Sequence, residues 1–209
     1  RQGAVPASDR LAALTGELRP VAGDVTLFGK PIPHDSSALL EMRKSVGVLL
    51  QGNGLLTDLT VAENVALPLR THTRLPAAVL RRLVEMKLHA VGLLAAADAW
   101  PRELSGGMAR RVALARALAK GAPLMLLDEP LVNLDYKLRE ELRAEMREIF
   151  KHRRAIVVYA TTESSEALML GGNSVVMDAG RVLQTGPAIQ VYRNPATVRV
   201  AEVFSDPPI

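Results

Sequence analysis

The sequence contains no cysteine and very few aromatic residues. The absence of cysteine from 209 residues excludes a disulfide scaffold and thiolate metal sites, and it fits a reducing compartment. Aromatic residues make up 3% of the chain and hydrophobic residues 48%, so the core must be built mainly from aliphatic side chains. No apolar run approaches the roughly 20 residues that cross a bilayer, which excludes a membrane-spanning helix within this sequence.

Neither sign of charge is in large excess. The 26 Lys and Arg residues exceed the 22 Asp and Glu residues by a net charge of +4. The basic residues are dispersed and are not interleaved with aromatic residues, so they indicate a solvated surface rather than a nucleic-acid footprint. We therefore expect no nucleic-acid partner. The length fits one domain, or one domain with an inserted subdomain.

Short apolar strands alternate with helical segments along the chain. The patterns predict strands at 24–28, 46–50, 124–127 and 155–159 and a hairpin across 178–180. They predict a first helix that ends at Pro20 and further helices at about 39–44, 106–119, 136–152 and 163–170. The pattern from 61 to about 94 is helical, and no strand is predicted there. This order predicts an α/β fold with a mostly parallel sheet, interrupted by one all-helical insertion.

Two consecutive carboxylates follow a wholly apolar strand. Asp128 and Glu129 come directly after Leu124–Leu127. The carboxyl ends of strands are where open α/β sheets bind ligands, and a buried charge is unfavourable without a partner. Asp128 would suit a hydrated Mg²⁺ that bridges phosphates, and Glu129 would suit the acceptance of a proton from an attacking water. The alternative is that both acids lie on the surface and cap the next helix.

A second feature is the turn Leu104-Ser105-Gly106-Gly107-Met108. Ser105 is a good N-cap residue, and the two glycines allow close approach to the backbone amides of a helix N-terminus. These properties predict an anion site. A Ser-Gly-Gly turn can equally be only the start of a helix, but this one lies about twenty residues before the Asp-Glu pair.

Together these segments resemble the nucleotide-binding domain of ABC transporters. Residues 104–108 are similar to that family's signature motif, 124–129 to its Walker B motif and 131–135 to its D-loop, and Gln51 follows a buried strand as the Q-loop glutamine does. The resemblance implies an α/β fold with a P-loop NTPase (RecA-like) core and an inserted α-helical ABC subdomain. It makes residues 1–209 a nucleotide-binding domain that is incomplete at the N-terminus, and residues 55–100 the helical subdomain.

The resemblance also implies a role for each matching residue. Glu129 would be the general base, and Asp128 would hold Mg²⁺ through water. Gln51 would reach Mg²⁺ and the attacking water, and Asp135 would couple two ATP sites. The signature residues would contact the γ-phosphate of ATP held by another copy: Ser105, Gly106, Gly107 and Met108.

The implied cofactors are ATP and Mg²⁺. The implied partners are a second ABC ATPase domain, in a homodimer or heterodimer, and an integral-membrane permease subunit. Through that permease the chain would lie peripherally on the cytoplasmic face of the inner membrane. The implied activity is that of an ABC-type ATP hydrolase.

The phosphate loop departs from the family pattern Gly-x-x-x-x-Gly-Lys-Ser/Thr. Counting back from Gly16 places the family's glycine at Pro6, its lysine at Ala7 and its hydroxyl at Ser8, and only Ser8 fits. Without the lysine no ammonium meets the β- and γ-phosphates, and Pro6 lacks an N–H that the loop would use. The strands that precede this loop in the family are also missing. We therefore expect a truncated or degenerate Walker A region, and weak ATP binding and slow hydrolysis by this chain alone.

A second departure lies after the strand at 155–159. Thr162 stands where the family's switch histidine is expected. A threonine can donate one hydrogen bond to a γ-phosphate, but it cannot take up and release a proton as histidine does. Some sugar-importer-like ATPases of the family are similar to this Thr-Thr-Glu variant.

The resemblance is divided between two kinds of transporter. Residues 54–70 and the Met108–Arg111 end of the signature are similar to the phospholipid-trafficking (Mla-type) ATPase, whereas residues 133–195 are more similar to carbohydrate-importer ATPases. The lipid-like part includes the segment expected to touch the permease, so we favour lipid transport. The alternatives are a carbohydrate importer, a degenerate domain that donates its signature motif to a partner's ATP site, and a soluble ABC protein acting on nucleic acid or ribosomes.

Overall fold

A computed structural model describes residues 7–49, 52–132, 134, 136–151 and 155–205. The chain divides into two compact units, of which the larger is Leu11–Ala160 and the smaller is drawn from Arg1–Arg10 and Thr161–Ile209. Helix α1 (Ala7–Leu14) crosses the boundary between them. Among the described residues, no helix combines the length and the apolar character needed to cross a membrane.

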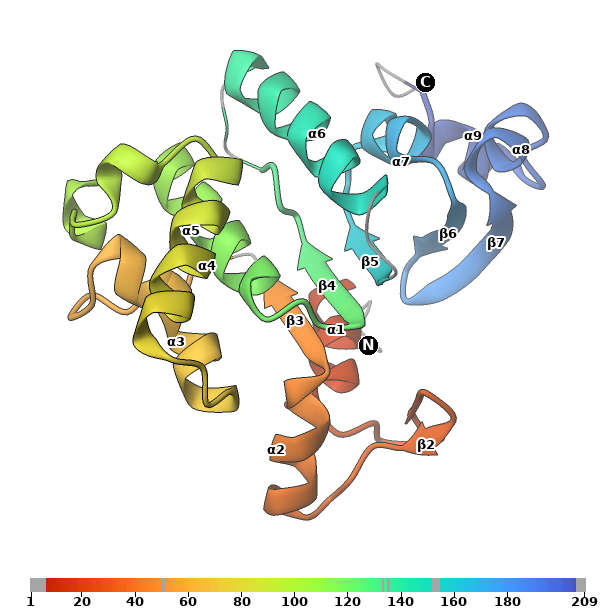
Figure 1. Ribbon diagram of the computed structural model, residues 1–209. Helices are drawn as coiled ribbons and strands as arrows, with labels where there is room; N and C mark the ends of the chain where they lie inside the picture. The colour runs from red at the N-terminus through yellow and green to blue at the C-terminus, as the bar shows by residue number, and fades with distance from the viewer. Residues whose placement is uncertain (1–6, 50–51, 133, 135, 152–154, 206–209) are drawn as a thin grey trace. The chain divides into compact units, whose positions relative to one another are not determined.

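The larger unit is centred on a three-stranded parallel sheet. Figure 1 shows β4 (Leu124–Asp128) between β3 (Val46–Leu49) and β5 (Ile156–Ala160). Both neighbours pair with β4 in parallel, and every residue of β4 is buried. A parallel strand covered on both faces needs a continuous apolar sequence, which explains the unbroken hydrophobic run before Asp128. The predicted parallel sheet is confirmed.

The two faces of β4 belong to different hydrophobic clusters. Met125 and Leu127 pack with residues of α5 (Gly106–Ala119) and α6 (Tyr136–Lys151), whereas Leu124 and Leu126 pack with Leu11 of α1. The close packing of α5 on the sheet needs a glycine in β3. A Cβ built on Gly47 would lie 2.6 Å from the Met125 Sδ and 2.7 Å from the Ala117 carbonyl oxygen.

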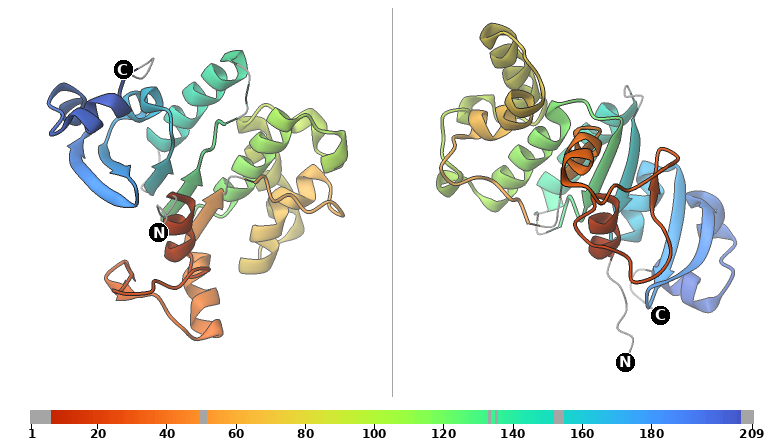
Figure 2. Two further views of the ribbon diagram at one scale, coloured as in Figure 1. Left: turned by 180° about the vertical axis from the view of Figure 1, so that it is seen from behind. Right: turned by 90° about the horizontal axis from the view of Figure 1, so that it is seen from below.

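A layer of helices covers the other side of α5. Helices α3 (Val61–His72) and α4 (Ala77–Ala90) pack against each other and against α5, as Figure 2 shows. Two 3₁₀ turns follow at Leu94–Ala96 and Pro101–Glu103. Because α5 has the sheet on one side and helices on the other, it buries apolar residues around most of its circumference.

The N-terminal part of the larger unit differs from the predicted boundaries. Helix α1 ends at Leu14 rather than at Pro20, because Gly16 adopts a left-handed conformation (φ 70°) and the amides of Gly16 and Glu17 bond back to the last turn. The predicted strand at 24–28 shortens to β1 (Thr26–Leu27), which pairs with β2 (Lys30–Pro31). Helix α2 (Ser36–Lys44) then leads into β3.

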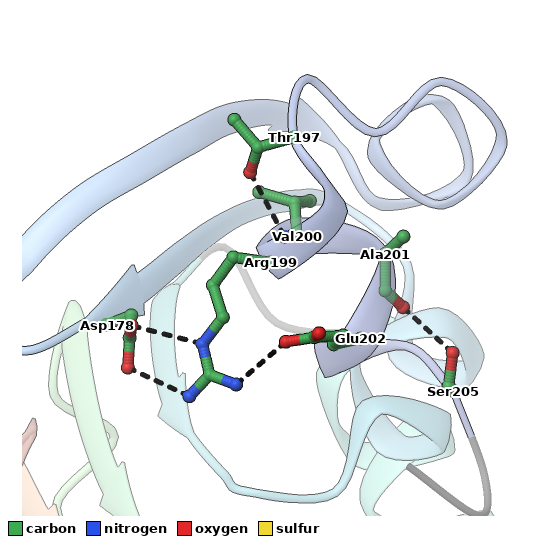
Figure 3. Close-up of polar contacts among 7 residues, drawn as sticks. All are labelled: Asp178, Thr197, Arg199, Val200, Ala201, Glu202 and Ser205. Carbon is green, nitrogen blue, oxygen red and sulfur yellow. Dashed lines mark hydrogen bonds and ion pairs between the residues drawn. The ribbon is translucent and has the colours of Figure 1, made fainter. Parts of the chain in front are cut away.

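The smaller unit contains α7 (Ser164–Leu170), β6 (Asn173–Asp178), β7 (Arg181–Pro187), α8 (Ala188–Arg193) and α9 (Val198–Val203). The predicted antiparallel hairpin is confirmed, and it carries a bulge at Val176 and Met177. Figure 3 shows how Arg199 of α9 donates hydrogen bonds to both oxygens of Asp178, at 3.1 and 3.2 Å, and to Glu202 at 2.9 Å. Exposed polar contacts thus attach α9 to the turn of the hairpin.

Candidate functional site

Asp128 is the last residue of β4 and is 2% exposed. Side chains alternate along a strand, so Asp128 continues the row of Leu124 and Leu126, on the face covered by α1. A buried carboxylate favours a cation or a hydrogen-bond donor as its partner.

Glu129 follows in an unusual backbone conformation. Its φ of 48° lies in the left-handed region that non-glycine residues rarely adopt. The Glu129 amide donates to the Ala160 carbonyl at 2.9 Å, and the Glu129 carbonyl accepts from the Val132 amide at 3.2 Å. Such a conformation persists only where the surroundings determine it, and it is common at functional sites. The side chain leaves the strand direction at this point and is only half-buried.

The turn after β4 is held by Arg110 of α5. Its guanidinium donates to the Asp128 carbonyl at 2.7 Å, the Glu129 carbonyl at 2.6 Å and the Pro130 carbonyl at 2.9 Å. Burial lowers the pKa of Arg110, and the nearby negative groups, Asp128 foremost, oppose that shift. A buried cation therefore lies beside the candidate catalytic carboxylates.

The signature turn forms the exposed start of α5. Ser105 is the N-cap, and its hydroxyl accepts a hydrogen bond from the Met108 amide at 3.2 Å. Ser105 and Gly106 are exposed, whereas Gly107 and Met108 are partly covered. A Cβ built on Gly106 would meet no atom within 4 Å, so the space above this turn is open. The first amides of a helix have no backbone partner within it, and here the Met108 amide is capped by Ser105.

The segment that leads into α3 is held by two polar side chains, one partly buried and one fully buried. Arg116 of α5 donates to the Gly54 carbonyl at 2.6 Å and the Asn53 carbonyl at 3.1 Å. Asn64 of α3 is fully buried, accepts from the Leu56 amide and donates to three carbonyls between residues 56 and 60. The path of this segment is therefore determined on both sides.

Four predicted site residues are less completely placed. Gln51 and Asp135 lie outside the described residues. Ser8 is in the first turn of α1, and its side chain lies outside the described part of the structure. Thr162 is exposed in the loop before α7, in the smaller unit.

The loop at Thr162 is braced by its neighbour Thr161. The Thr161 hydroxyl donates to Glu166, a buried carboxylate, at 2.6 Å and accepts from the Glu163 amide at 3.0 Å.

The arrangement fits phosphate and magnesium chemistry. Asp128 offers a buried carboxylate to a cation, and the open first turn of α5 offers backbone amides to an anion. No group of three or more His, Asp or Glu residues gathers within the described ranges. Mg²⁺ is ordinarily bound through one or two carboxylates with waters and substrate phosphates, which matches the single buried Asp128.

Comparison with solved structures defines the class of fold. The dimeric ATP-binding cassette MJ0796, in a post-hydrolysis state with ADP and Pi, matches with a TM-score of 0.80 and 28% identity, over 87% of this chain and 80% of that one. The cbiO1 protein of Clostridium perfringens, part of the ABC transporter complex cbiONQ, matches with a TM-score of 0.78 and 25% identity, over 94% of this chain and 78% of that one. The fold is that of a P-loop NTPase, as predicted.

The family follows from the sequence. The model of the ABC transporter family matches residues 8–132, which is more than half of the chain. This chain belongs to the ABC transporter family and contains its ATP-binding domain.

Curated relatives have several transported substrates. Identity is 39% to the sulfate/thiosulfate import ATP-binding protein CysA 2 of Chromobacterium violaceum, over 94% of this chain and 52% of the relative. Identity is 40% to the spermidine/putrescine import ATP-binding protein PotA of Thermobifida fusca, over 90% of this chain and 48% of the relative. Identity is 38% to the intermembrane phospholipid transport system ATP-binding protein MlaF of Escherichia coli, over 88% of this chain and 69% of the relative. The chain thus spans about half the length of the two importer relatives.

Arg110, Arg116 and Asn64 were not predicted from the sequence to have a role. For Arg110 a signal was available, because it lies three and four residues before Ala113 and Leu114, on a helix rich in apolar residues. A cation on the apolar face of a helix is expected to be buried and paired. Three hydrogen bonds of Arg110 go to backbone carbonyls distant in sequence, which no side-chain pattern reveals.

Proposed function

We propose that this chain is the ATP-binding subunit of an ABC transporter, which couples ATP binding and hydrolysis in a head-to-tail dimer to transport by a separate permease. The transported molecule in this proposal is a lipid. The chain is peripheral on the cytoplasmic face of the inner membrane, where the permease holds it. ATP and Mg²⁺ are its substrate and its metal.

The observation that carries the proposal is the end of β4. A buried carboxylate, Asp128, precedes a half-buried one, Glu129, whose backbone is held in the left-handed region. The difference in burial suits the two carboxylates to different roles. Asp128 would hold Mg²⁺ through water, while Glu129, which is more accessible, would accept the proton of the attacking water. Bound Mg²⁺ supplies neutralisation of charge on the phosphates.

The remaining residues complete the proposed site. Gln51 orients the water and Mg²⁺, Thr162 donates a hydrogen bond to the γ-phosphate, and Ser8 lies beside the phosphates. Asp135 couples the two sites of the dimer. The signature residues act on the ATP of the other copy, through the open first turn of α5: Ser105, Gly106, Gly107 and Met108. The dimeric state of the MJ0796 protein supports the proposal that two copies associate.

Lipid as the transported molecule is supported by a relative that matches a shorter stretch of this chain at higher identity. The MlaF protein of Haemophilus influenzae is 47% identical over 126 residues, a higher identity than the 39% and 40% of the two importers over longer stretches. The partnership with a permease is supported by the cbiO1 protein, which is part of a transporter complex.

A second candidate function is that of a degenerate domain, which donates its signature motif to a partner's ATP site. Ala7, at the start of α1, stands where the family's count places the phosphate-loop lysine, and this observation favours the second candidate. In that case Ser105 and the glycines would remain functional, while Asp128 and Glu129 would face a weakly occupied site.

The test compares ATP hydrolysis by the purified wild-type chain, Glu129→Gln and a loop variant that carries Pro6→Gly with Ala7→Lys. Loss of a general base lowers the rate by about 10²–10⁴-fold, so Glu129→Gln is expected to lose hydrolysis while ATP binding remains. Glu85→Gln is the matched control, because Glu85 is exposed on α4.

Three outcomes separate the candidates. Wild-type hydrolysis that depends on Glu129 supports the first candidate. Hydrolysis that appears only in the loop variant, and is lost again with Glu129→Gln, supports the degenerate domain. Hydrolysis that persists in Glu129→Gln contradicts the role assigned to this residue.

A further inference from the structure

Arg110 is the one described residue of α5 whose hydrogen bonds reach the turn after β4. It is 4% exposed, and its Nε and Nη2 atoms donate to three successive carbonyls, those of Asp128, Glu129 and Pro130. Two other arginines of the same helix also bind carbonyls, but at other places. Arg111 donates to Val91, and Arg116 donates to Asn53 and Gly54.

Glu129 needs such a contact because its backbone is strained. A non-glycine residue in the left-handed region is unfavourable, and it persists only where neighbouring groups determine it. Here the Glu129 amide is held by the Ala160 carbonyl of β5, and the Glu129 carbonyl is held by the Val132 amide and by Arg110. Since φ sets the direction of the Cβ, these contacts also set the direction of the carboxylate.

A structural role alone explains Arg110 poorly. Removing a guanidinium from water is unfavourable, and well-packed apolar side chains often replace buried ion pairs without loss of stability. Only a fork of several N–H groups, however, can bond to several carbonyls in fixed directions. The position therefore requires N–H donors in fixed directions, and not only a side chain that fills the space.

We infer that Arg110 is a positioning residue, which holds the left-handed turn at Glu129 and so aims the Glu129 carboxylate at the attacking water. The role of the carboxylate rests on the proposed function, whereas the role of Arg110 in holding the turn does not. Lysine at this position would keep the charge but would offer a single nitrogen to the three carbonyls.

The experiment uses the full chain without nucleotide, and then with Mg²⁺ and ATP. Amide hydrogen exchange is measured at Glu129 and Val132 in the wild type, Arg110→Gln, Arg110→Lys and the control Arg111→Gln. Loss of a charged hydrogen bond corresponds to about a tenfold change in equilibrium, so we expect about tenfold faster exchange in Arg110→Gln, a smaller increase in Arg110→Lys and no increase in Arg111→Gln. With ATP we expect kcat to fall about tenfold in Arg110→Gln while KM stays within about twofold.

The outcomes for the two proposals are distinguishable. Unchanged exchange at Glu129 and Val132 in both Arg110 variants would overturn the inference, whether or not the chain hydrolyses ATP. A fall in kcat matched by an equal rise in KM would also overturn it, because loss of aim affects the chemical step rather than binding. A wild type that shows no hydrolysis contradicts the proposed function, and the exchange measurement then decides the role of Arg110 by itself. If Arg110→Gln does not fold, Arg110→Lys carries the same comparison.

Discussion

The carboxyl end of β4 and the first turn of α5 are built in opposite ways. At the strand end Asp128 is buried, and the backbone of the following turn is held by Arg110, Val132 and β5. At the helix start Ser105 and Gly106 are exposed, and the space beside Gly106 is empty of neighbouring atoms. The strand end is therefore fixed by its own chain, whereas the helix start is open to a ligand or to another molecule.

This difference fits a site assembled from two copies. A general base must be aimed before the reaction begins, which requires a rigid setting. A group that closes onto the ligand of another copy must stay accessible until that copy arrives. The comparison thus supports placing the chemistry at Glu129 and the closing contact at Ser105, as proposed above.

The largest expected effect comes from filling the open turn. In the loop variant, Ser105→Arg is expected to weaken ATP-dependent association by about 100-fold, or about 2.7 kcal/mol, because a bulky cation would occupy the space above the helix. Analytical ultracentrifugation with and without Mg²⁺ and ATP measures the change.

The matched control is Ser105→Ala, which loses the same N-cap bond to Met108 and so the same stability, about 1 kcal/mol. It should still associate when ATP is present. Association of Ser105→Arg at the wild-type level would contradict the open-turn assignment.

A smaller effect comes from replacing glycine by alanine in β3, which pairs with β4, and in the first turn of α5. Gly47→Ala is expected to lower the free energy of unfolding by about 1–3 kcal/mol, because the new Cβ would press on Met125 and on the Ala117 carbonyl. Gly106→Ala meets nothing, so its stability should stay within about 1 kcal/mol of the wild type and rise rather than fall. Urea unfolding followed by circular dichroism compares the two. Equal losses would mean that the helix start is as tightly packed as the sheet.

The smallest effect concerns an arginine in a contrasting setting, Arg199. It lies exposed and bonds to carboxylates, and the hydrogen bond from Arg199 lowers the pKa of Asp178 below its ordinary value of 3.8. A depressed carboxyl pKa stabilises the fold above pH 3.8, and that stabilisation is lost as pH falls through the lower value.

An NMR titration of the Asp178 side chain checks this prediction. The pKa should rise toward its ordinary value in Arg199→Gln, and high salt should reduce the difference, because the pair is solvated. A pKa that is the same in both proteins would show that Arg199 does not act on Asp178.

Much of the fold could be predicted because its signals are local. The unbroken apolar run before Asp128 identified β4, and Ser105 with its two glycines identified the start of α5, which the structure places at Gly106. The hairpin was predicted from the turn at Asp178, and it is confirmed. Boundaries were less reliable, since α1 ends at Leu14, where a glycine in the left-handed region overrides the leucine spacing that continues beyond it.

The side chains of the candidate site could be predicted from the sequence, but the contacts that hold its backbone could not. Asp128, Glu129 and Ser105 were visible because carboxylates after an apolar strand, and a cap before glycines, are unusual in sequence. Arg110 acts on backbone carbonyls about twenty residues away, and such contacts leave no pattern of residue types. The left-handed conformation of Glu129 was equally invisible, because it is imposed by those contacts rather than by the residue.

The central claim is that each ATP site combines the strand end of one copy with the helix start of another. Its most direct test mixes two loop-variant chains, one also carrying Glu129→Gln and the other Ser105→Ala, and measures hydrolysis against each chain alone. Each chain alone should be slow. Random pairing makes half of the dimers mixed, with one intact site of two, so the mixture should recover about a quarter of the loop-variant rate. A mixture no faster than the average of its two components would contradict the account.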